Sequence, residues 1–517
     1  MIIRDNHQGV RMKPAALFVI LSIAASLPPQ PARSQCTQTT QVAQATLPAQ
    51  AMHSAPAKQS AQDKLPPSDL AVLYGLAPVT ALATPNAGYT KQAALGANYA
   101  ITGGIQTGEI RQPTLLPFPE QQQQALRDVS LTTANLAQLA DGLGTSLGAA
   151  YLARLHYLDR IRFSPPPGEK TDDFVPIDLT DLIDLINYAN TTTAHNSATA
   201  KYFFANATTD GNTLAPEDAL SIFKNSERCP DMFGTAYGHP AGSPGSDKYG
   251  NSRPFQTEPT LTRIFGRDYF GTPADNIAYN RGPMMDLTNS PSFPSGHTTY
   301  GYTGAVLLAV LVPERYPEMM VRAAEYGNDR IIIGAHYAMD VIAGRTLTLY
   351  GMAHLLADDE NYTDPKHSLF QKLPKIVFSD AVKSTREKLE KALEEACGEK
   401  IAKCAKEDTG RMSDPAIDEA FYLSTQTYGL PVVYPAQADV LEDVAKLAPE
   451  AGYLLIVAYP SLTLPEADRI LTETEGPGGG FLDDGSLIDG KSFGVYSRLN
   501  LYAASRRAAE LTAKPSH

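Results

Sequence analysis

Three consecutive apolar segments in the middle of the chain constrain its fold most strongly. They cover residues 299–312, 317–330 and 336–356, and Pro313 and Pro317 stand between the first two. Proline cannot continue a helix from within, but it suits a helix start, so these prolines predict a reversal between two helices. Clear alternating strand patterns are scarce in the rest of the chain. The sequence therefore predicts an all-α fold.

Further helix-like patterns lie on both sides of this centre. Apolar residues recur at helical spacing in residues 120–155, 178–188, 375–396, 414–427, 438–448 and 496–513. A length of 517 residues predicts two domains or one that is strongly elaborated. The predicted organisation is an N-terminal, mainly helical region at 67–200, a core at 201–360 and a C-terminal helical region at 361–517.

The N-terminus has the pattern of a secretory signal peptide. Basic residues precede the apolar run 15–27, and Ala32-Arg33-Ser34 is a small-x-small cleavage site. We expect a signal peptide at 1–34, followed by a disordered linker rich in Gln, Ala, Thr and Pro at 35–66. No later stretch offers about 20 apolar residues, so we expect a soluble periplasmic or secreted protein without stable membrane insertion. The alternative is an uncleaved N-terminal anchor.

The composition excludes one class of binding partner and is informative about the cellular compartment. The chain has 43 basic and 56 acidic residues and a formal net charge of -13, which argues against a general nucleic-acid binder. An anionic ligand must therefore be held by a local cluster. The four cysteines are compatible with an oxidising compartment, and the spacing of Cys397 and Cys404 predicts a short disulfide.

Four short motifs carry the chemistry of the sequence. They are Lys-Tyr-Gly-Asn-Ser-Arg-Pro at 248–254, Pro-Ser-Gly-His at 294–297, Asp-Arg at 329–330 and His-Tyr-Ala-Met-Asp at 336–340. A helix that begins near Ser295 rises about 26 Å, and the next helix descends about 20 Å, so Arg330 returns near His297. His336 and Asp340 are four residues apart and share a helix face.

These residues suit the binding of a phosphate group. Arg253 and Arg330 supply permanently charged, planar donors for phosphate oxygens. The backbone amides of Gly296 and His297 at a helix start add donors that point at an anion. The motifs therefore predict a phosphate site that uses no metal.

The histidines suit a covalent reaction at the bound phosphate. Asp340 is expected to fix the tautomer of His336 and leave the other ring nitrogen free to attack. His297 is then available to protonate the leaving oxygen.

The motifs resemble the three-part signature of the type 2 phosphatidic acid phosphatase superfamily, which includes bacterial class A acid phosphatases and vanadium-dependent haloperoxidases. The family pattern is Lys-x6-Arg-Pro, Pro-Ser-Gly-His and Ser-Arg-x5-His-x3-Asp. The resemblance covers roughly residues 245–350 and implies a helical bundle of the acid phosphatase and haloperoxidase type with additional helical regions. It implies the phosphate ligands Arg253, Arg330, Ser295 and Gly296, the general acid His297, the nucleophile His336 and its partner Asp340.

Two positions depart from the family pattern. Ser246 stands where the family has lysine, and Lys248 is the nearest lysine that could bind phosphate in its place. Asp329 replaces the serine before Arg330, which predicts either repulsion of the substrate or an ion pair with Arg330 or Lys248.

The sequence thus predicts an exported acid phosphatase that hydrolyses small phosphomonoesters through a phosphohistidine on His336, with no cofactor. One alternative is a haloperoxidase that holds vanadate on His336 as a prosthetic group; in a phosphatase, vanadate would instead inhibit. Another is a non-catalytic, anion-binding envelope protein. Two simpler interpretations are a metal site formed by His297, His336 and Asp340, and an ordinary helix-surface pair of His336 and Asp340.

Overall fold

The computed structural model is predominantly helical, which confirms the predicted fold class. It describes residues 64–84, 87–110, 113–130, 136–155, 180–224, 229–258, 261–364 and 375–513. In this part of the chain the only strands are β1 (Phe265–Arg267) and β2 (Pro273–Asp275), which form one short antiparallel hairpin. The predicted signal peptide and residues 35–63 of the predicted linker lie outside the described residues.

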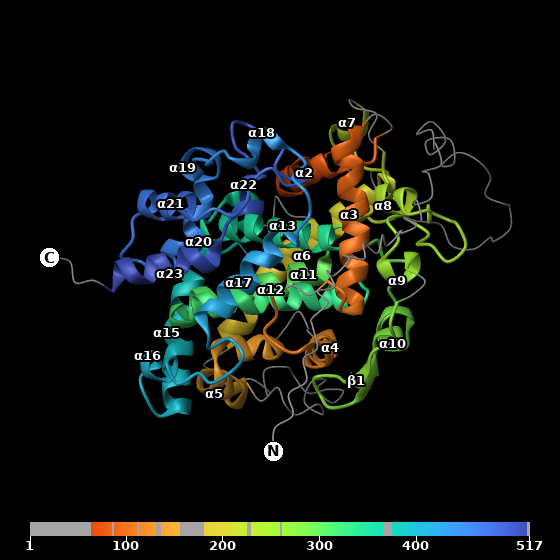
Figure 1. Ribbon diagram of the computed structural model, residues 1–517. Coiled ribbons are helices and arrows are strands. Elements are labelled where there is room, and N and C mark those ends of the chain that lie inside the picture. The colour runs from red at the N-terminus through yellow and green to blue at the C-terminus, as the bar shows by residue number, and fades with distance from the viewer. Residues whose placement is uncertain are drawn as a thin grey trace, which may run out of the picture.

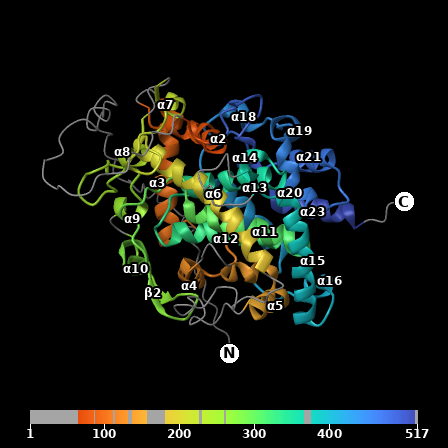
Figure 2. The same cartoon turned by 180° about the vertical axis from the view of Figure 1, so that it is seen from behind.

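Four helices form the centre of the molecule. They are α6 (Thr180–Asn206), α11 (Gly296–Leu311), α12 (Tyr316–Ile332) and α13 (Ala338–Leu356). Helix α11 packs against the other three, and the two views show it in the middle of the molecule (Figures 1 and 2). Almost every residue of α11 is buried, as expected for a helix that is apolar on all sides. The expected reversal occurs at η8 (Pro313–Arg315).

Shorter helices surround this centre on several sides (Figure 1). Before α11 they are α2 (Pro67–Leu76), η2 (Ala77–Leu82), α3 (Gly88–Thr107), α4 (Phe118–Arg127), η3 (Asp128–Ser130), η4 (Ala137–Leu143), α5 (Thr145–Leu155), α7 (Glu217–Lys224), α8 (Met232–Ala236), α9 (Pro254–Thr257) and α10 (Asn276–Arg281). After α13 they are α14 (Glu360–Thr363), α15 (Phe378–Cys397), α16 (Ile401–Cys404), α17 (Pro415–Thr427), α18 (Pro435–Ala438), α19 (Val444–Leu447), η10 (Pro449–Gly452), α20 (Tyr453–Ile456), α21 (Leu464–Glu473), α22 (Val495–Arg498) and α23 (Leu501–Thr512).

Two predicted helices are divided in the structure. The pattern at 120–155 becomes α4, η3, η4 and α5, with Gly144 in a positive-φ conformation directly before α5. The pattern at 438–448 retains only the single turn of α19 and the last residue of α18. There, the backbone amides of Glu442 and Val444 donate to the side chains of Glu475 and Thr472, so tertiary contacts replace helical hydrogen bonds.

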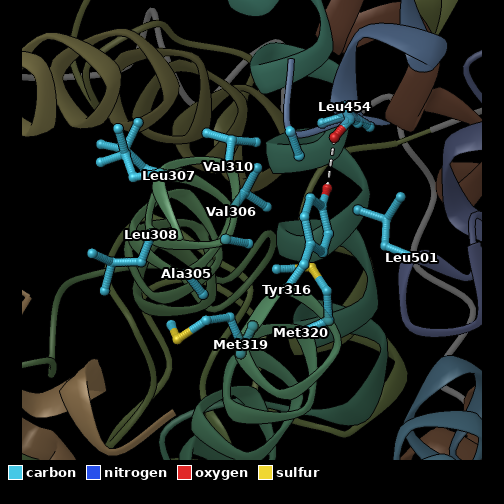
Figure 3. Packing of buried hydrophobic residues seen from close by; sticks show 14 of the residues in the cluster. Ala305, Val306, Leu307, Leu308, Val310, Tyr316, Met319, Met320, Leu454 and Leu501 are labelled. Carbon is cyan, nitrogen blue, oxygen red and sulfur yellow. Dashed lines mark hydrogen bonds between the residues drawn. The ribbon is translucent and has the colours of Figure 1, made fainter. Parts of the chain in front are cut away.

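Buried side chains fix the relative positions of the central helices. Figure 3 shows Tyr316 of α12 among the apolar side chains of α11, with its hydroxyl donating to the Leu454 carbonyl at 2.8 Å. Burying a tyrosine costs little when its hydroxyl has such a partner. A second apolar cluster contains Phe255, Phe293 and residues 331–333, and it supports the loops that carry the motifs.

A buried ion network anchors α12 to the N-terminal helices. Arg322 contacts Asp128 at 2.6 Å and Asp141 at 2.7 Å, and Arg411 contacts Glu325 at 2.6 Å. The surrounding carboxylates, opposing the effect of burial, raise the pKa of Arg322 above its ordinary value. Removing one member would leave buried charges without compensation.

Two further sequence expectations concern the cysteines and the membrane. Cys397 and Cys404 form the predicted disulfide, which joins the end of α15 to α16. Within the described ranges, no helix combines the length and the apolar character that crossing a bilayer requires.

Candidate active site

The structure brings the chemical motifs together at one end of the central helices. Arg253 directly precedes α9, His297 lies in the first turn of α11 and Arg330 lies in the last turn of α12. His336 lies in the connection between α12 and α13, and Asp340 lies in the first turn of α13. The antiparallel course of α11 and α12 therefore returns Arg330 to the level of His297.

His336 is at the centre of the cluster. Its Nε2 atom lies 3.0 Å from Arg253 Nη1 and 3.0 Å from His297 Nδ1. A guanidinium has only donors, so Nε2 accepts this hydrogen bond and a neutral His336 carries its proton on Nδ1. The ring therefore presents an unprotonated nitrogen to the cationic side of the site.

Asp340 lies on the opposite side of the His336 ring. Its Oδ2 atom is 3.4 Å from His336 Nδ1, within ion-pair range but longer than a hydrogen bond. The same oxygen accepts from the Ser292 hydroxyl and from the Tyr337 amide, whereas Oδ1 has no partner among the described residues. Burial raises the pKa of Asp340 to about 7, although these hydrogen bonds and Arg253 oppose the shift.

The surroundings of both histidines favour the neutral form of the ring. Burial, followed by the charge of Arg253, lowers the pKa of each ring well below the ordinary value of 6.5. His336 is fully buried and His297 is partly exposed, so the site opens to solvent at His297. A bound anion would weaken the repulsion by the cations and raise the pKa of His297.

The two arginines differ in how firmly they are held. Arg253 donates to the carbonyl oxygens of Ser290 at 2.5 Å, Ala335 at 3.0 Å and Pro291 at 3.2 Å, which fix its plane. Arg330 donates only to the Ala125 carbonyl at 3.2 Å, and its Nε and Nη1 atoms have no hydrogen-bond partner among the described residues. Arg330 therefore retains donors for an anion.

The start of α11 contributes backbone donors. Ser295 is the N-cap, and its hydroxyl oxygen accepts from the Thr298 amide at 3.1 Å and from the Thr298 hydroxyl at 2.8 Å. The amides of Gly296 and His297 belong to the first helical turn, where no intrahelical acceptor exists. The α13 helix approaches closely at Gly344, where a methyl group would lie 2.6 Å from the Ser295 carbonyl oxygen.

Lys248 does not join the cluster, which corrects the expectation that it binds phosphate. Its side chain is exposed, and its Nζ lies 4.5 Å from the ring centre of the neighbouring Tyr249. The chain turns tightly around the buried Asp247, which accepts from the Tyr249 amide at 2.8 Å and whose own amide donates to Ser252. This turn directs Lys248 outward. Ser246, at the family lysine position, pairs with Ser243 instead.

Lys201 occupies the site although the sequence motifs did not include it. It lies on α6, and its Nζ donates at 3.3 Å to the Ser290 hydroxyl, which also accepts from Arg253 Nη2 at 3.1 Å. Burial lowers the pKa of Lys201 to about 7, and Arg253 adds to the effect. No motif spacing marks Lys201 in the sequence, and its place beside the buried Ala200 and Ser197 is known only from the structure.

Asp329, which replaces the family serine before Arg330, is fully buried. Neither predicted ion pair, with Arg330 or with Lys248, forms within the described residues, where both carboxylate oxygens of Asp329 lack a donor. Burial, together with the carboxylates of Asp128 and Glu325, raises its pKa well above the ordinary value. This shift favours the uncharged form of Asp329, which repels an anion less than a carboxylate does.

The result is a cluster with a strong excess of positive charge. Arg253, Arg330 and Lys201 surround two histidines. Asp340 and Asp247 are the acidic groups that act on Arg253 and Lys201. Across the described ranges, no group of three or more His, Cys, Asp or Glu residues is arranged to hold a metal ion. The geometry suits an anion with several oxygens, such as a phosphoryl group.

The sequence of this region matches a known protein family. Residues 246–361 match the PAP2 superfamily, and this stretch contains both histidines, Asp340 and both arginines of the site. The chain therefore has a PAP2 superfamily domain, as the motifs implied. Lys201 lies outside the matched stretch.

The chain is also distantly homologous to bacterial acid phosphatases over a short segment. It is 44% identical over 69 residues to a non-specific acid phosphatase of Salmonella typhimurium, covering 13% of this chain and 28% of the relative. It is 39% identical over 72 residues to an acid phosphatase of Zymomonas mobilis (14% and 27%). It is 35% identical over 74 residues to a non-specific acid phosphatase of Providencia stuartii (14% and 30%). The chain thus spans less than a third of the length of these relatives.

Proposed function

We propose that this protein is an exported acid phosphatase that hydrolyses phosphomonoesters through a phosphohistidine on His336, without a metal ion. One observation supports the proposal most directly: His336 Nε2 lies 3.0 Å from both Arg253 Nη1 and His297 Nδ1. An unprotonated nitrogen is a nucleophile, a guanidinium binds phosphoryl oxygens and a second imidazole carries a proton. The guanidinium of Arg253 and the imidazole of His297 both lie beside the nucleophilic atom, His336 Nε2.

In the first step, the lone pair on His336 Nε2 attacks phosphorus and the bond to the ester oxygen breaks. Protonated His297 gives its proton to that oxygen, so a neutral alcohol leaves. Asp340, 3.4 Å from Nδ1, stabilises the positive charge that the ring acquires when its own carboxyl group is ionised. In the second step, water attacks the phosphohistidine and gives a proton to His297, and the P–N bond breaks to release phosphate.

The cations of the site replace a metal ion in this mechanism. Arg253 is fixed by three carbonyl oxygens, and Arg330 has unused donors for the phosphoryl oxygens. The first-turn amides of α11 add further donors. Preorganised donors of this kind stabilise the charge on the transferring phosphoryl group.

Export is part of the proposal. The basic and apolar pattern of residues 1–34 and the Cys397–Cys404 disulfide both favour an oxidising compartment outside the cytoplasm. Expression of the full chain in a bacterium, followed by fractionation, tests this part. We expect the mature protein in the periplasm or medium, with its N-terminus after Ser34; a full-length chain in the cytoplasm would refute it.

Phosphate release from p-nitrophenyl phosphate tests the activity. We expect hydrolysis between pH 5 and 7, with and without EDTA, none in His336→Ala, and a base-stable, acid-labile phosphoenzyme after rapid quenching. Activity that EDTA abolishes and zinc restores would favour a metal site. Oxidation of bromide by peroxide after addition of vanadate, without phosphatase activity, would favour a haloperoxidase.

A further inference from the structure

We infer that Lys201 is a further substrate-binding residue, whose ammonium group binds a phosphoryl oxygen beside Arg253. The inference rests on the proposed phosphatase function and deepens it. It assigns to the site a cation that comes from α6, outside the PAP2 match.

The position of the ammonium group carries the inference. Lys201 Nζ and Arg253 Nη2 lie 3.3 Å and 3.1 Å from the same atom, the Ser290 hydroxyl oxygen. A Cβ atom on Gly296 would lie 3.6 Å from Lys201 Nζ and 3.6 Å from the Ser197 hydroxyl oxygen. The ammonium group therefore lies between a phosphate-binding guanidinium and the first turn of α11.

The ammonium group of Lys201 has hydrogen-bond donors that are not used. An ammonium group has three donors, and only the one to Ser290 is used within the described residues. No carboxylate of the described residues lies within ion-pair distance of Nζ. Two like charges that converge on a neutral hydroxyl repel each other, and an anion between them removes this repulsion. A purely structural lysine would instead be expected to pair with a carboxylate.

Lys201 also supplies what the motifs lack. The family lysine position is Ser246, which pairs with Ser243, and Lys248 points to solvent. Because Lys201 comes from a different helix, it reaches the phosphate site from the side of Gly296. The chain thus provides an ammonium group at the site from a helix that lies outside the sequence motifs.

The proton on Lys201 makes phosphate binding depend on pH. The charged groups that act on Lys201 are Arg253 and Asp247 from the loop before α9 and Asp340 from α13. Lys201 in turn acts on His297 and His336. The pKa of Lys201 is lowered to about 7, so the ammonium form is present below pH 7 and is lost as the pH rises through this value. We expect its contribution to binding to disappear in the same range.

Binding of inorganic phosphate to the full mature chain tests the inference, with isothermal titration calorimetry at pH 6.0 and pH 8.5. At pH 6.0 we expect Lys201→Met to weaken binding by about 10- to 100-fold, as for the loss of a charged hydrogen bond. Lys201→Arg should stay within about threefold of the wild type, because it keeps the charge. At pH 8.5 the ratio of phosphate affinities between wild type and Lys201→Met should be smaller by about tenfold or more. Comparing variants at each pH cancels the titration of phosphate itself.

Lys248→Met is the matched control, since it removes a lysine charge that points to solvent near the same loop, and we expect unchanged phosphate affinity. A measurement on the wild type covers the case in which a variant does not fold. Competitive acetylation followed by mass spectrometry should show that phosphate slows the labelling of Lys201 by about tenfold and leaves Lys248 unaffected.

Two results would overturn the inference: Lys201→Met that binds phosphate as tightly as the wild type at pH 6.0, or labelling of Lys201 that saturating phosphate does not change. Both experiments measure binding without turnover. A wild-type protein that binds phosphate through Lys201 but hydrolyses no ester would contradict the proposed activity and leave this inference intact.

Discussion

Asp340→Asn should reduce kcat/KM strongly at high pH and only slightly at low pH. The substitution keeps the shape of the side chain, and the amide oxygen can still accept from Ser292 and Tyr337 as Oδ2 does. The tautomer of His336 is set by the donor of Arg253 and not by a hydrogen bond to Asp340. The variant therefore removes one thing, the negative charge beside Nδ1.

The magnitude follows from the 3.4 Å separation of His336 Nδ1 and Asp340 Oδ2. At an effective dielectric constant of about 20, two full charges at this distance interact by about 5 kcal/mol. The transition state develops only part of the charge on the ring, so we expect a loss of about 100- to 1,000-fold at pH 8. The pKa of Asp340 is raised to about 7, so the carboxylate is charged above this pH and neutral below it. At pH 5 the loss should be within about tenfold.

The ratio of wild-type to variant kcat/KM, measured with p-nitrophenyl phosphate from pH 5 to pH 8.5, tests this reasoning because kcat/KM reports the free enzyme. Asp359→Asn is the matched control: Asp359 pairs with His354 Nδ1 at 2.7 Å, outside the site, and its loss should leave kcat/KM unchanged. A ratio for Asp340→Asn that stays constant across this range, or a value near one at pH 8, would refute the role of the charge.

Three other predictions concern the acid, the absence of a metal and the ion network. His297→Ala should reduce hydrolysis of an alkyl phosphate about 100-fold more than that of p-nitrophenyl phosphate, whose leaving group needs no proton; equal losses would argue against a general acid. EDTA should leave hydrolysis unchanged, and vanadate should inhibit it by imitating five-coordinate phosphorus at His336; loss with EDTA would contradict the cationic site. Arg322→Met should lower the free energy of unfolding in urea by about 3–5 kcal/mol, because the buried Asp128 loses its ion-pair partner. The exposed pair of Arg469 and Glu473 is the control, where Arg469→Met should cost no more than about 0.5 kcal/mol.

The central helices were predictable because their signals are local and strong. Residues 299–312 are almost continuously apolar, and Pro313 and Pro317 mark the reversal, so α11 and α12 lie where the pattern places them. The segment 438–448 was predicted wrongly because the competing hydrogen bonds come from Glu475 and Thr472, which are distant in sequence. Local periodicity carries no information about such partners.

The site residues also divide into those that local signals predict and those that depend on contacts distant in sequence. Helix length and a single reversal predicted that His297, Arg330 and His336 meet. They could not position Arg253, which reaches His336 from the loop before α9. Lys248 was misplaced because a turn around the buried Asp247 directs it outward, and turn geometry depends on contacts that the motif does not encode. Lys201 was missed because α6 crosses the site from a distant part of the chain.

The electrostatics of the site explain how two histidines with similarly lowered pKa values can take opposite roles in the proposed mechanism. Without an anion, burial and Arg253 keep both rings neutral, which His336 needs in order to attack. A phosphoryl dianion cancels part of the positive charge of Arg253, Arg330 and Lys201, so binding raises the pKa of His297, the more exposed ring. The lone pair of His336 Nε2 is meanwhile directed at phosphorus and is not available for a proton. The negative charge of the substrate thereby raises the pKa of its own general acid, so that His297 is protonated. The nucleophile His336 stays neutral until the P–N bond forms.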